Sequence, residues 1–479
     1  MTAEEEIEGL RAENAALRAQ VSELPRLRAQ VEALAAQVRD LQARAAKDSH
    51  NSGKPPSSDG LQRRTKSLRK PSGKKAGGQL GHRGETLHLV ATPDAVVEHR
   101  PTVCSACQAE LDEAPVVAHE RRQVQELPAV RLHVTEHRAL HVRCPACQAV
   151  SVGTFPVEAP SRAQYGPQLR ALAVYLVEEQ FVPLGRVQQV LRDLVSVRLG
   201  RGTLVRWIQQ AARTLAPVEA QLTAALRQAP VLHSDETGVR RAGALAWVQV
   251  ASTSQLTRYA VHAKRGREAI DAMGILPDFT GVSVHDGFAT YRRSTRCRHA
   301  LCNIHHLREL TFLEEQYQQT WATELKALLQ EMKAAVAQAR AEGLSSLPAA
   351  THAAFVTRYQ ALLAAGHAAN PPPERRPRQR GRVKQTPARN LLERLWLGQD
   401  QVLAFLSDLT IPFDNNQAER DLRTLKLHQK VSGCFRSDPG ADAFARLRSY
   451  LATLRKQGQA LLAALQTVFA GRPLYPALG

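Results

Sequence analysis

The chain has 479 residues, which is enough for about three domains of about 150 residues each. At 43% hydrophobic residues it can bury real cores, which excludes a globally disordered protein. Lys and Arg outnumber Asp and Glu by 64 to 45, a net charge of +19, so we expect a polyanionic partner, nucleic acid first and an anionic membrane second.

The sequence shows neither a membrane-spanning segment nor a secretory signal. No apolar run approaches the ~18 residues of a membrane span, and the acidic N-terminus lacks the apolar segment of a secretory signal. Seven cysteines in so long a chain exclude a disulfide framework, and four of them form two C-x-x-C pairs, which indicate metal binding in a reducing compartment. We therefore expect a cytoplasmic protein with no membrane partner.

Residues 1–47 are predicted to form a coiled coil. Apolar residues recur at alternating spacings of three and four: Ile7, Leu10, Leu17, Val21, Leu24, Leu27, Val31, Leu34, Val38 and Leu41. Asn14 also lies on this seam, where it favours two strands in one register, and Pro25 should kink the helix. The alternative is a lone amphipathic helix packed on its own protein. Because so polar a helix is unstable alone, we expect a homo-oligomer, a dimer, held by this segment.

Residues 48–95 are rich in Pro, Ser, Gly and basic residues and have too few apolar ones to fold, which predicts a disordered basic linker. The stretch "RRTKSLRKPSGKK" (63–75) carries seven basic residues and no acidic one. Two interpretations remain open here. The segment is either a solvated spacer or an arm that lies along phosphates and orders on binding.

Residues 96–155 are predicted to form a zinc-ribbon-like module. Cys104 and Cys107 make one C-x-x-C pair, and Cys144 and Cys147 make another. Two such pairs complete a tetrahedral four-cysteine site with no open position, so this zinc should be structural. Redox chemistry is the competing interpretation, although it needs only one pair. The alternation in "VRLHVTEHRALHVR" between the pairs predicts a strand pair.

Residues 160–217 are predicted to form three helices, the last two joined by a short glycine-containing turn. Thr203 is a good N-cap for the last helix, and helix, turn, helix is a DNA-binding arrangement. The side chains expected on the exposed face of that helix can contact bases or phosphates: Arg206, Gln209, Gln210 and Arg213. Three-helix packing with no role in DNA binding is the alternative.

Residues 225–306 change to a period of two. Three apolar strands, a helix and a fourth strand follow in order, and this order resembles the start of a ribonuclease-H-like sheet. The first strand carries Asp235 and Glu236, and the fourth ends at Asp286. In that topology the first and fourth strands are neighbours, so Asp235 and Asp286 should lie side by side. Adjacent carboxylates repel, and a divalent cation relieves the repulsion.

Residues 411–479 contain "DNNQAERDLR" (414–423), which predicts a helix capped by Asp414, Asn415 or Asn416 with Glu419 in its first turns. A carboxylate among cations would repel phosphate unless a metal ion lay between them, which makes Glu419 a third metal ligand. Two hard ions, Mg²⁺ or Mn²⁺, can promote an in-line displacement at a phosphate. The basic residues of the helix are predicted DNA contacts: Arg420, Arg423, Lys426 and Lys430.

Residues 307–410, between the second and third acids, should form a large helical insertion, broken by the basic loop 370–389. Near its start lies a group of cysteines and histidines: Cys297, His299, Cys302, His305 and His306. This group is a candidate second zinc site, and packing or hydrogen bonding in the core is the alternative explanation.

Taken together, the motifs resemble a DDE transposase of the insertion-sequence-sixty-six family. The resemblance follows the order "NSGKPPSSD", "GGQLGHRGE", the two C-x-x-C pairs, "SDETGVR", "HDGFATY", "CNIHHLREL", "PFDNNQAERDLR" and "KVSGCFRSDPGADAFARLRSYLATLRKQG". It assigns the acidic triad to Asp235, Asp286 and Glu419, with Glu236 and Asp414 as adjacent rivals. Glu236 should point to the opposite side of its strand, and Asp414 is better placed as a cap. Gln108 and Gln148 depart from the glycine that is usual after a zinc knuckle.

The resemblance implies a multidomain α+β protein that cleaves DNA at the terminal inverted repeats of an insertion sequence and joins the ends to target DNA. Asp235, Asp286 and Glu419 would hold two Mg²⁺ or Mn²⁺ ions, and the coiled coil would pair protomers. Accessory proteins encoded by the same element are further candidate partners, and the protein would work at the bacterial nucleoid. Two alternatives stay open: a ribonuclease-H-like nuclease without strand transfer, and a non-catalytic DNA-binding regulator.

Overall fold

The computed structural model describes residues 3–52, 73, 75, 77–79, 81–84, 86–373 and 383–478. The predicted basic segment 63–75, apart from residues 73 and 75, and residues 374–382 of the basic loop 370–389 lie outside these ranges. Within them, none of the helices has the length and hydrophobicity that a bilayer crossing requires.

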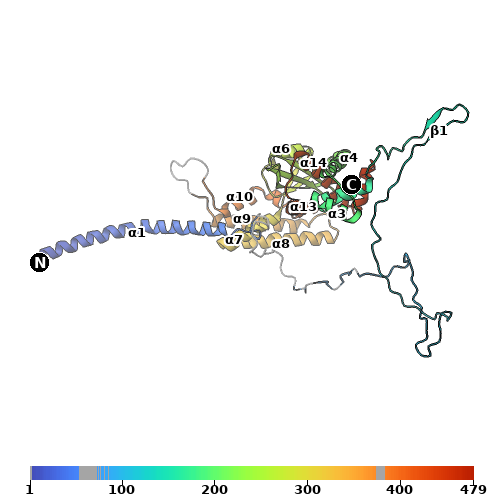
Figure 1. The fold of residues 1–479 in the computed structure, drawn as a ribbon. Coiled ribbons are helices and arrows are strands. Elements are labelled where there is room, and N and C mark those ends of the chain that lie inside the picture. Colours follow the sequence, from blue (N-terminus) through green and yellow to red (C-terminus); the bar gives the residue numbers. More distant parts are fainter. Residues whose placement is uncertain are drawn as a thin grey trace.

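The N-terminal helix α1 (Ala3–Ala45) projects from the rest of the chain as a long, gently curved rod (Figure 1). It continues as one helix through Pro25, which was expected to kink it. Only its C-terminal end is packed. Ala43 is buried in the same core cluster as Phe312, and Lys47 lies over the Phe312 ring at 4.6 Å. The apolar seam itself is exposed along its whole length.

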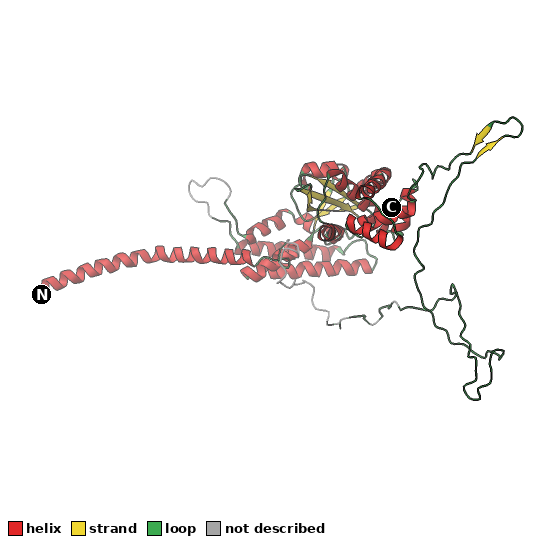
Figure 2. Ribbon diagram, viewed as in Figure 1, coloured by secondary structure: helices red, strands yellow, loops and turns green. Residues whose placement is uncertain are grey.

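Residues 86–165 contain little regular secondary structure (Figure 2). The expected strand pair within 130–143 is wrong. A short antiparallel pair, β1 (His141–Arg143) and β2 (Val150–Val152), forms instead across the second C-x-x-C turn. The apolar side chains of 130–140 are exposed, so the alternation in this stretch has no core to pack against.

A helical unit follows. Its elements are α2 (Pro167–Val174), the π-helical turn η2 (Tyr175–Glu179), α3 (Leu184–Val195), α4 (Arg201–Thr214) and α5 (Ala216–Gln228). Three helices were expected here, and α2, α3 and α4 correspond to them. The predicted N-cap is wrong: α4 begins two residues earlier than Thr203, and Gly200 is its N-cap. Gly200 has extended backbone angles, which suit that position without a side-chain cap.

A mixed five-stranded sheet forms the centre of the second half of the chain. Its strands are β3 (Val231–Arg241), β4 (Ala244–Ser252), β5 (Thr257–His262), β6 (Val282–His285) and β7 (Arg298–Leu301). They lie in the order β5-β4-β3-β6-β7, antiparallel among β3, β4 and β5 and parallel among β3, β6 and β7. The prediction that the first and fourth strands are neighbours is confirmed.

Three short helical elements connect the strands: α6 (Arg267–Met273), η3 (Leu276–Asp278) and η4 (Tyr291–Arg293). The predicted insertion is helical, as α7 (Asn303–Tyr317), α8 (Thr320–Ala341), α9 (Ala349–Ala369), α10 (Pro387–Leu397), α11 (Gln399–Val402) and α12 (Ala404–Ser407). The chain then returns to the sheet with α13 (Asn416–Ser432), α14 (Asp438–Lys456) and α15 (Leu461–Phe469).

The two faces of the sheet are covered by different helices. Because side chains alternate along a strand, Val239 of β3 and its neighbours Val248 and Val250 share the face that also carries Asp235. That face packs on Leu422 and Leu425 of α13 and on α14. The opposite face of β3 carries Leu232, and it packs in a separate core with α6. The helix with the third acid therefore covers the face of the first.

Candidate active site

Asp235 and Asp286 lie at corresponding positions of neighbouring parallel strands. His233 pairs with Val284, so Asp235 and Asp286 each lie two residues further along the same register. Burial is the main cause that raises the pKa of Asp235 well above its usual range. The negative charges of Glu236, Asp286 and Glu419 raise it further, against a hydrogen bond from the Glu236 N–H. The charges of the other two predicted acids, Asp286 and Glu419, therefore both act on Asp235.

The backbone around Asp286 is held by a chain of hydrogen bonds. The Phe288 N–H donates to Asp286 Oδ1 at 2.8 Å, and the Gly287 N–H donates to His285 Nδ1 at 3.0 Å. Gly287 has φ = 92°, a conformation that favours glycine. Since His285 Nδ1 accepts, its Nε2–H donates to His299 Nδ1 at 3.1 Å, and His299 Nε2–H then donates to the Ser294 carbonyl at 3.1 Å. Both rings are thus neutral, and burial lowers the pKa of His285 to about 3.

Asn415 fixes the start of the helix that carries Glu419. Its side chain is buried, its Nδ2 donates to the Ser234 carbonyl at 2.9 Å, and its Oδ1 accepts from His233 Nδ1 at 2.9 Å. Its backbone N–H donates to Cys302 Sγ at 3.2 Å. One asparagine therefore ties α13 both to β3 and to the end of β7. The sequence predicts Asn415 only as a possible cap, and α13 does begin directly after it, with Glu419 in the first turn.

Glu419 has an unusual set of neighbours. Its Oε1 atom is buried and has no hydrogen-bond partner, while Oε2 lies 3.8 Å from the Arg423 guanidinium. One ligand atom each of Cys302, His305 and Glu419 lies within 4.8 Å of the other two. Among the described residues this is the only group of three that meets this criterion. The carboxylate oxygens of Asp235, Asp286 and Glu419 therefore do not all lie within 4.8 Å of one another. Glu419 thus lies close to a cysteine and a histidine, and its charge also acts on Asp235.

Glu236, one of the two rivals, is on the opposite face of β3, as expected. Its carboxylate pairs with Arg265 at 2.6 Å and accepts a hydrogen bond from the Tyr291 hydroxyl. Arg265 in turn lies over the rings of Trp247, at 4.8 Å, and Phe288, at 4.2 Å. Although burial raises the pKa of Glu236, these two partners oppose the rise.

Asp414, the other rival, has structural partners. Its Oδ1 accepts from the Asn416 N–H at 3.2 Å, and Lys333 lies 3.6 Å from its other oxygen. The prediction that Asp414 is the cap is wrong, because Asn415 holds the N-cap position of α13 and Asp414 supports the turn before it.

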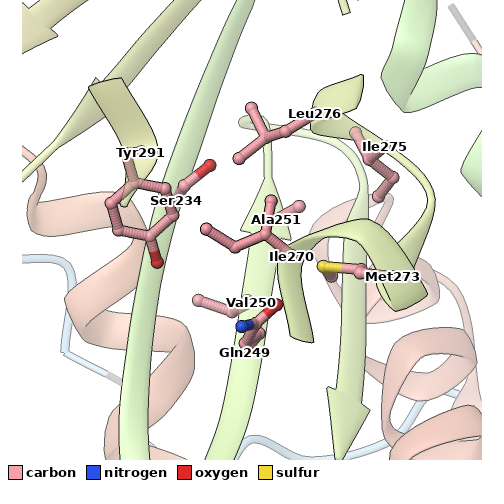
Figure 3. Close-up of a pocket in the computed structure, with 9 residues that line it drawn as sticks. All are labelled: Ser234, Gln249, Val250, Ala251, Ile270, Met273, Ile275, Leu276 and Tyr291. Carbon is pink, nitrogen blue, oxygen red and sulfur yellow. The ribbon is translucent and has the colours of Figure 1, made fainter. Parts of the chain in front are cut away.

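A small cavity lies on the Glu236 face of the sheet (Figure 3). It offers about 10 Å³ to the centre of a water molecule, and Tyr291, Ser234 and Gln249 supply its polar atoms beside apolar side chains of β4 and α6. Ser234 Oγ and Gln249 Nε2 lack hydrogen-bond partners. The space suits one buried water and is too small for a substrate. A larger cavity of about 510 Å³ lies between β7 and the helical insertion, and none of the three acids lines it.

The predicted DNA contacts are mostly open to solvent. Arg206 and Arg213 of α4 are exposed, and Gln209 and Gln210 are half-buried. On α13 the exposed basic residues are Arg420, Arg423 and Lys430. Lys426 differs, because it is half-buried and its Nζ donates to the Gly238 carbonyl at 3.3 Å.

The two C-x-x-C pairs form matching turns. In each, the first cysteine N–H donates to the carbonyl five residues on at 2.8 Å, and the glutamine after the second cysteine has φ near 60° (63° at Gln108 and 61° at Gln148). Backbone N–H groups within each turn lower the pKa of Cys104 and Cys144, which favours thiolates. The two turns do not meet in this structure, so the four-cysteine site stays a prediction.

The predicted Cys/His cluster is divided. Cys302 and His305 lie by Glu419, whereas His299 is bonded to His285 and Ser294, and His306 Nδ1 is bonded to Asn303. Sequence reasoning missed the role of Glu419 in this group, because Glu419 follows Cys302 by more than a hundred residues in the chain.

Comparison with known proteins agrees with the geometry. Residues 3–88 match a family described as one of unknown function. An uncharacterized protein of Sinorhizobium fredii (strain NBRC 101917 / NGR234), y4jD, is 25% identical over 391 residues, covering 76% of this chain and 73% of that protein. Residues 162–443 match the family described as "Transposase IS66 family", a range that holds the helical unit, the whole sheet and all three acids. The chain belongs to the IS66 family of transposases.

Proposed function

We propose that this transposase cuts DNA at the terminal inverted repeats of its element and joins the freed ends to target DNA, with a ribonuclease-H-like core that depends on divalent metal. The observation that carries the proposal is the register of β3 and β6, which places Asp235 beside Asp286, together with the bond from Asn415 to Ser234, which holds the start of the Glu419 helix against β3. The strand order β5-β4-β3-β6-β7 also supports a ribonuclease-H-like core.

The site carries the concentrated negative charge expected of a metal-binding site. Asp235 lies under the combined negative charge of Glu236, Asp286 and Glu419, and the Oε1 atom of Glu419 is buried without a partner. Buried carboxylates without partners are costly, and hard divalent ions prefer carboxylate oxygens. Asp235, Asp286 and Glu419 would hold Mg²⁺ or Mn²⁺, which when bound activates a nucleophile and stabilises the leaving oxygen of an in-line displacement.

The surrounding residues have positioning roles in this proposal. Asn415 sets the start of α13 against β3, and the relay from Gly287 through His285 to His299 sets the loop that carries Asp286. The exposed Arg420, Arg423 and Lys430 follow Glu419 along α13 and would hold phosphates on either side of the scissile one. Arg206 and Arg213 on α4 would contact the DNA of the element ends, with Gln209 and Gln210 beside them.

The two outlying segments have supporting roles. Cys104, Cys107, Cys144 and Cys147 would hold a structural zinc ion once their turns come together, since each turn already favours a thiolate. The exposed seam of α1 would pair two protomers so that both ends are cut together.

The proposal is tested by replacing each acid with its amide. Asp235→Asn, Asp286→Asn and Glu419→Gln should each lower Mg²⁺-dependent cleavage of terminal DNA by more than about 100-fold, because each removes a metal ligand. Binding of the same DNA in a gel-mobility assay should stay near normal, because little surface changes.

Asp414→Asn is the matched control, since Asp414 accepts from the Asn416 N–H and pairs with Lys333. It should cut nearly as well as the wild type. If Glu419→Gln retained full cleavage while Asp414→Asn lost it, the third ligand would be Asp414.

A further inference from the structure

Cys302, His305 and Glu419 bring a thiol, an imidazole and a carboxylate to one place. Their ligand atoms lie within 4.8 Å of one another. His305 Nδ1 and Glu419 Oε1 are both buried and both lack a hydrogen-bond partner. Two unpartnered polar atoms beside a buried sulfur are costly, so the arrangement indicates a ligand that all three can share.

The chemistry of this donor set differs from that of the three acids. A sulfur, a nitrogen and an oxygen ligand suit Zn²⁺, which is bound by three protein side chains and a water in many sites, whereas Mg²⁺ prefers oxygen alone. Ligand atoms around a tetrahedral zinc lie about 3.3–3.7 Å apart, so atoms that all lie within 4.8 Å of one another need to move closer by no more than about 1.5 Å. Cys302 is held by the N–H of Asn415, and the half-buried side chains of His305 and Glu419 can make this movement.

We propose that Cys302, His305 and Glu419 form a Zn²⁺ site beside the catalytic acids, and that zinc bound there keeps Glu419 away from Asp235 and Asp286 and so inhibits the transposase. Binding would release the thiol proton of Cys302 to solvent. The inhibitory part rests on the proposed function, whereas the zinc site itself does not.

The other members of the Cys/His group, Cys297, His299 and His306, make hydrogen bonds to other residues. The proposed site therefore consists of Cys302, His305 and Glu419. Cys297 Sγ donates to the Ser294 carbonyl at 3.3 Å, and His299 has partners on both ring nitrogens. Glu419, in contrast, is a candidate ligand of both centres. The ligand atoms of Glu419, Cys302 and His305 all lie within 4.8 Å of one another, whereas among the described residues the three acids do not form such a group. Zinc and catalysis would therefore compete for one side chain.

Zinc content tests the site directly. The full-length protein is dialysed against micromolar Zn²⁺, and bound zinc is counted by atomic emission for the wild type, His305→Ala and Cys297→Ser. The wild type and Cys297→Ser should hold one zinc ion more than His305→Ala, because two remaining ligands bind weakly. Since only the difference counts, zinc on Cys104, Cys107, Cys144 and Cys147 does not affect the result. His305 is half-buried and its Nδ1 is unpartnered, so its loss should leave folding intact, which circular dichroism checks.

Cobalt supplies a second measurement that does not depend on stoichiometry. Co²⁺ added to the metal-free wild type should give a stronger sulfur-to-cobalt absorption band than it gives with His305→Ala or Cys302→Ser, because any band from the four cysteines Cys104, Cys107, Cys144 and Cys147 is common to all three proteins. Equal zinc content and equal cobalt spectra in wild type and His305→Ala would overturn the site.

Inhibition is measured separately, with Mg²⁺ constant. Micromolar Zn²⁺ should slow cleavage of terminal DNA by the wild type by at least about 10-fold and should slow Cys297→Ser equally. His305→Ala should resist the same zinc concentration. If zinc bound at this site without slowing cleavage, the proposal that zinc and catalysis compete for Glu419 would be wrong. Absence of cleavage in every metal-ion mixture would contradict the proposed function and leave the zinc count standing.

Discussion

Single side chains set the geometry around the acids, and the His285–His299 pair is the clearest case. The bond from the Gly287 N–H fixes the tautomer of His285, which in turn fixes that of His299. His299→Ala would leave the buried Nε2–H of His285 without an acceptor, which costs about 1–3 kcal/mol. We expect a lower melting temperature and a higher Mg²⁺ concentration for half-maximal cleavage. His299→Asn, whose Oδ1 can replace Nδ1 as the acceptor, should restore both.

Arg298→Ala is the matched neighbour, because Arg298 is exposed and points to Asp408. It should change neither quantity. If His299→Ala lowered stability but left the Mg²⁺ dependence untouched, the relay would support the fold alone and would not position Asp286.

The sequence predicted the acids and missed several of the residues that hold them. Period-two alternation, which is a local pattern, and the resemblance of the strand order to a ribonuclease-H-like sheet were enough to predict Asp235 and Asp286 on neighbouring strands. The three hydrogen bonds of Asn415 and the approach of Glu419 to Cys302 join segments more than a hundred residues apart. Such contacts depend on tertiary packing, and a single sequence carries no local signal for them.

Among the elements, the π-helical turn η2 connects the helical unit to α14 through ion pairs. Glu179 is buried and pairs with Arg448 and Arg455 of α14. Its neighbour Glu178 is also buried, yet its Oε2 has no partner, and burial raises the pKa of Glu178 to about 8, against the charge of Arg448. An i→i−5 turn of this kind has no signature in apolar periodicity, so the sequence predicted an uninterrupted helix here.

Glu178 should make stability depend on pH. Its pKa is higher in the folded chain than the ordinary 4.5, so its contribution is complete below about pH 4.5 and is lost as pH rises through about 8. Glu178→Gln removes this titration. The variant should match the wild type within about 1 kcal/mol at pH 5 and exceed it by about 2–5 kcal/mol at pH 8.5. Denaturant unfolding at the two pH values measures the difference.

Glu179→Gln provides the contrast, because it leaves the buried Arg448 guanidinium without its carboxylate. It should destabilise by about 3–5 kcal/mol at both pH values. A Glu178→Gln variant with the same advantage at pH 5 as at pH 8.5 would show that Glu178 is ionised in the folded chain throughout.

For the whole molecule, the notable feature is the unpaired surface of α1. Ten large apolar residues of the seam are between 46% and 65% exposed, which is costly for a solitary helix in water. Its last turns are packed differently, through Ala43, and are followed by His50 and Asn51, which bond to Glu315 of α7. Deletion should therefore stop short of this anchor.

A chain without residues 1–38 should lose all of the seam except Leu41 and keep the anchor. We expect it to be monomeric by light scattering, to bind one DNA end normally and to form no paired-end complex. Asn14→Leu should strengthen association of the full chain and loosen the choice of oligomer, since it adds apolar contact on the seam. If paired-end complexes still formed after the deletion, the seam would not pair the protomers and would serve another partner.

The central claim is that one acidic site both cuts and joins DNA. Its most direct measurement is incubation of the wild-type protein with Mg²⁺, labelled terminal DNA of its element and a target plasmid, with the products separated by size. We expect nicks at the element's 3′ ends and labelled ends joined to the plasmid, both absent with Glu419→Gln. Nicks without joined products would leave a nuclease, and joined products that persist with Glu419→Gln would contradict the assignment of the site.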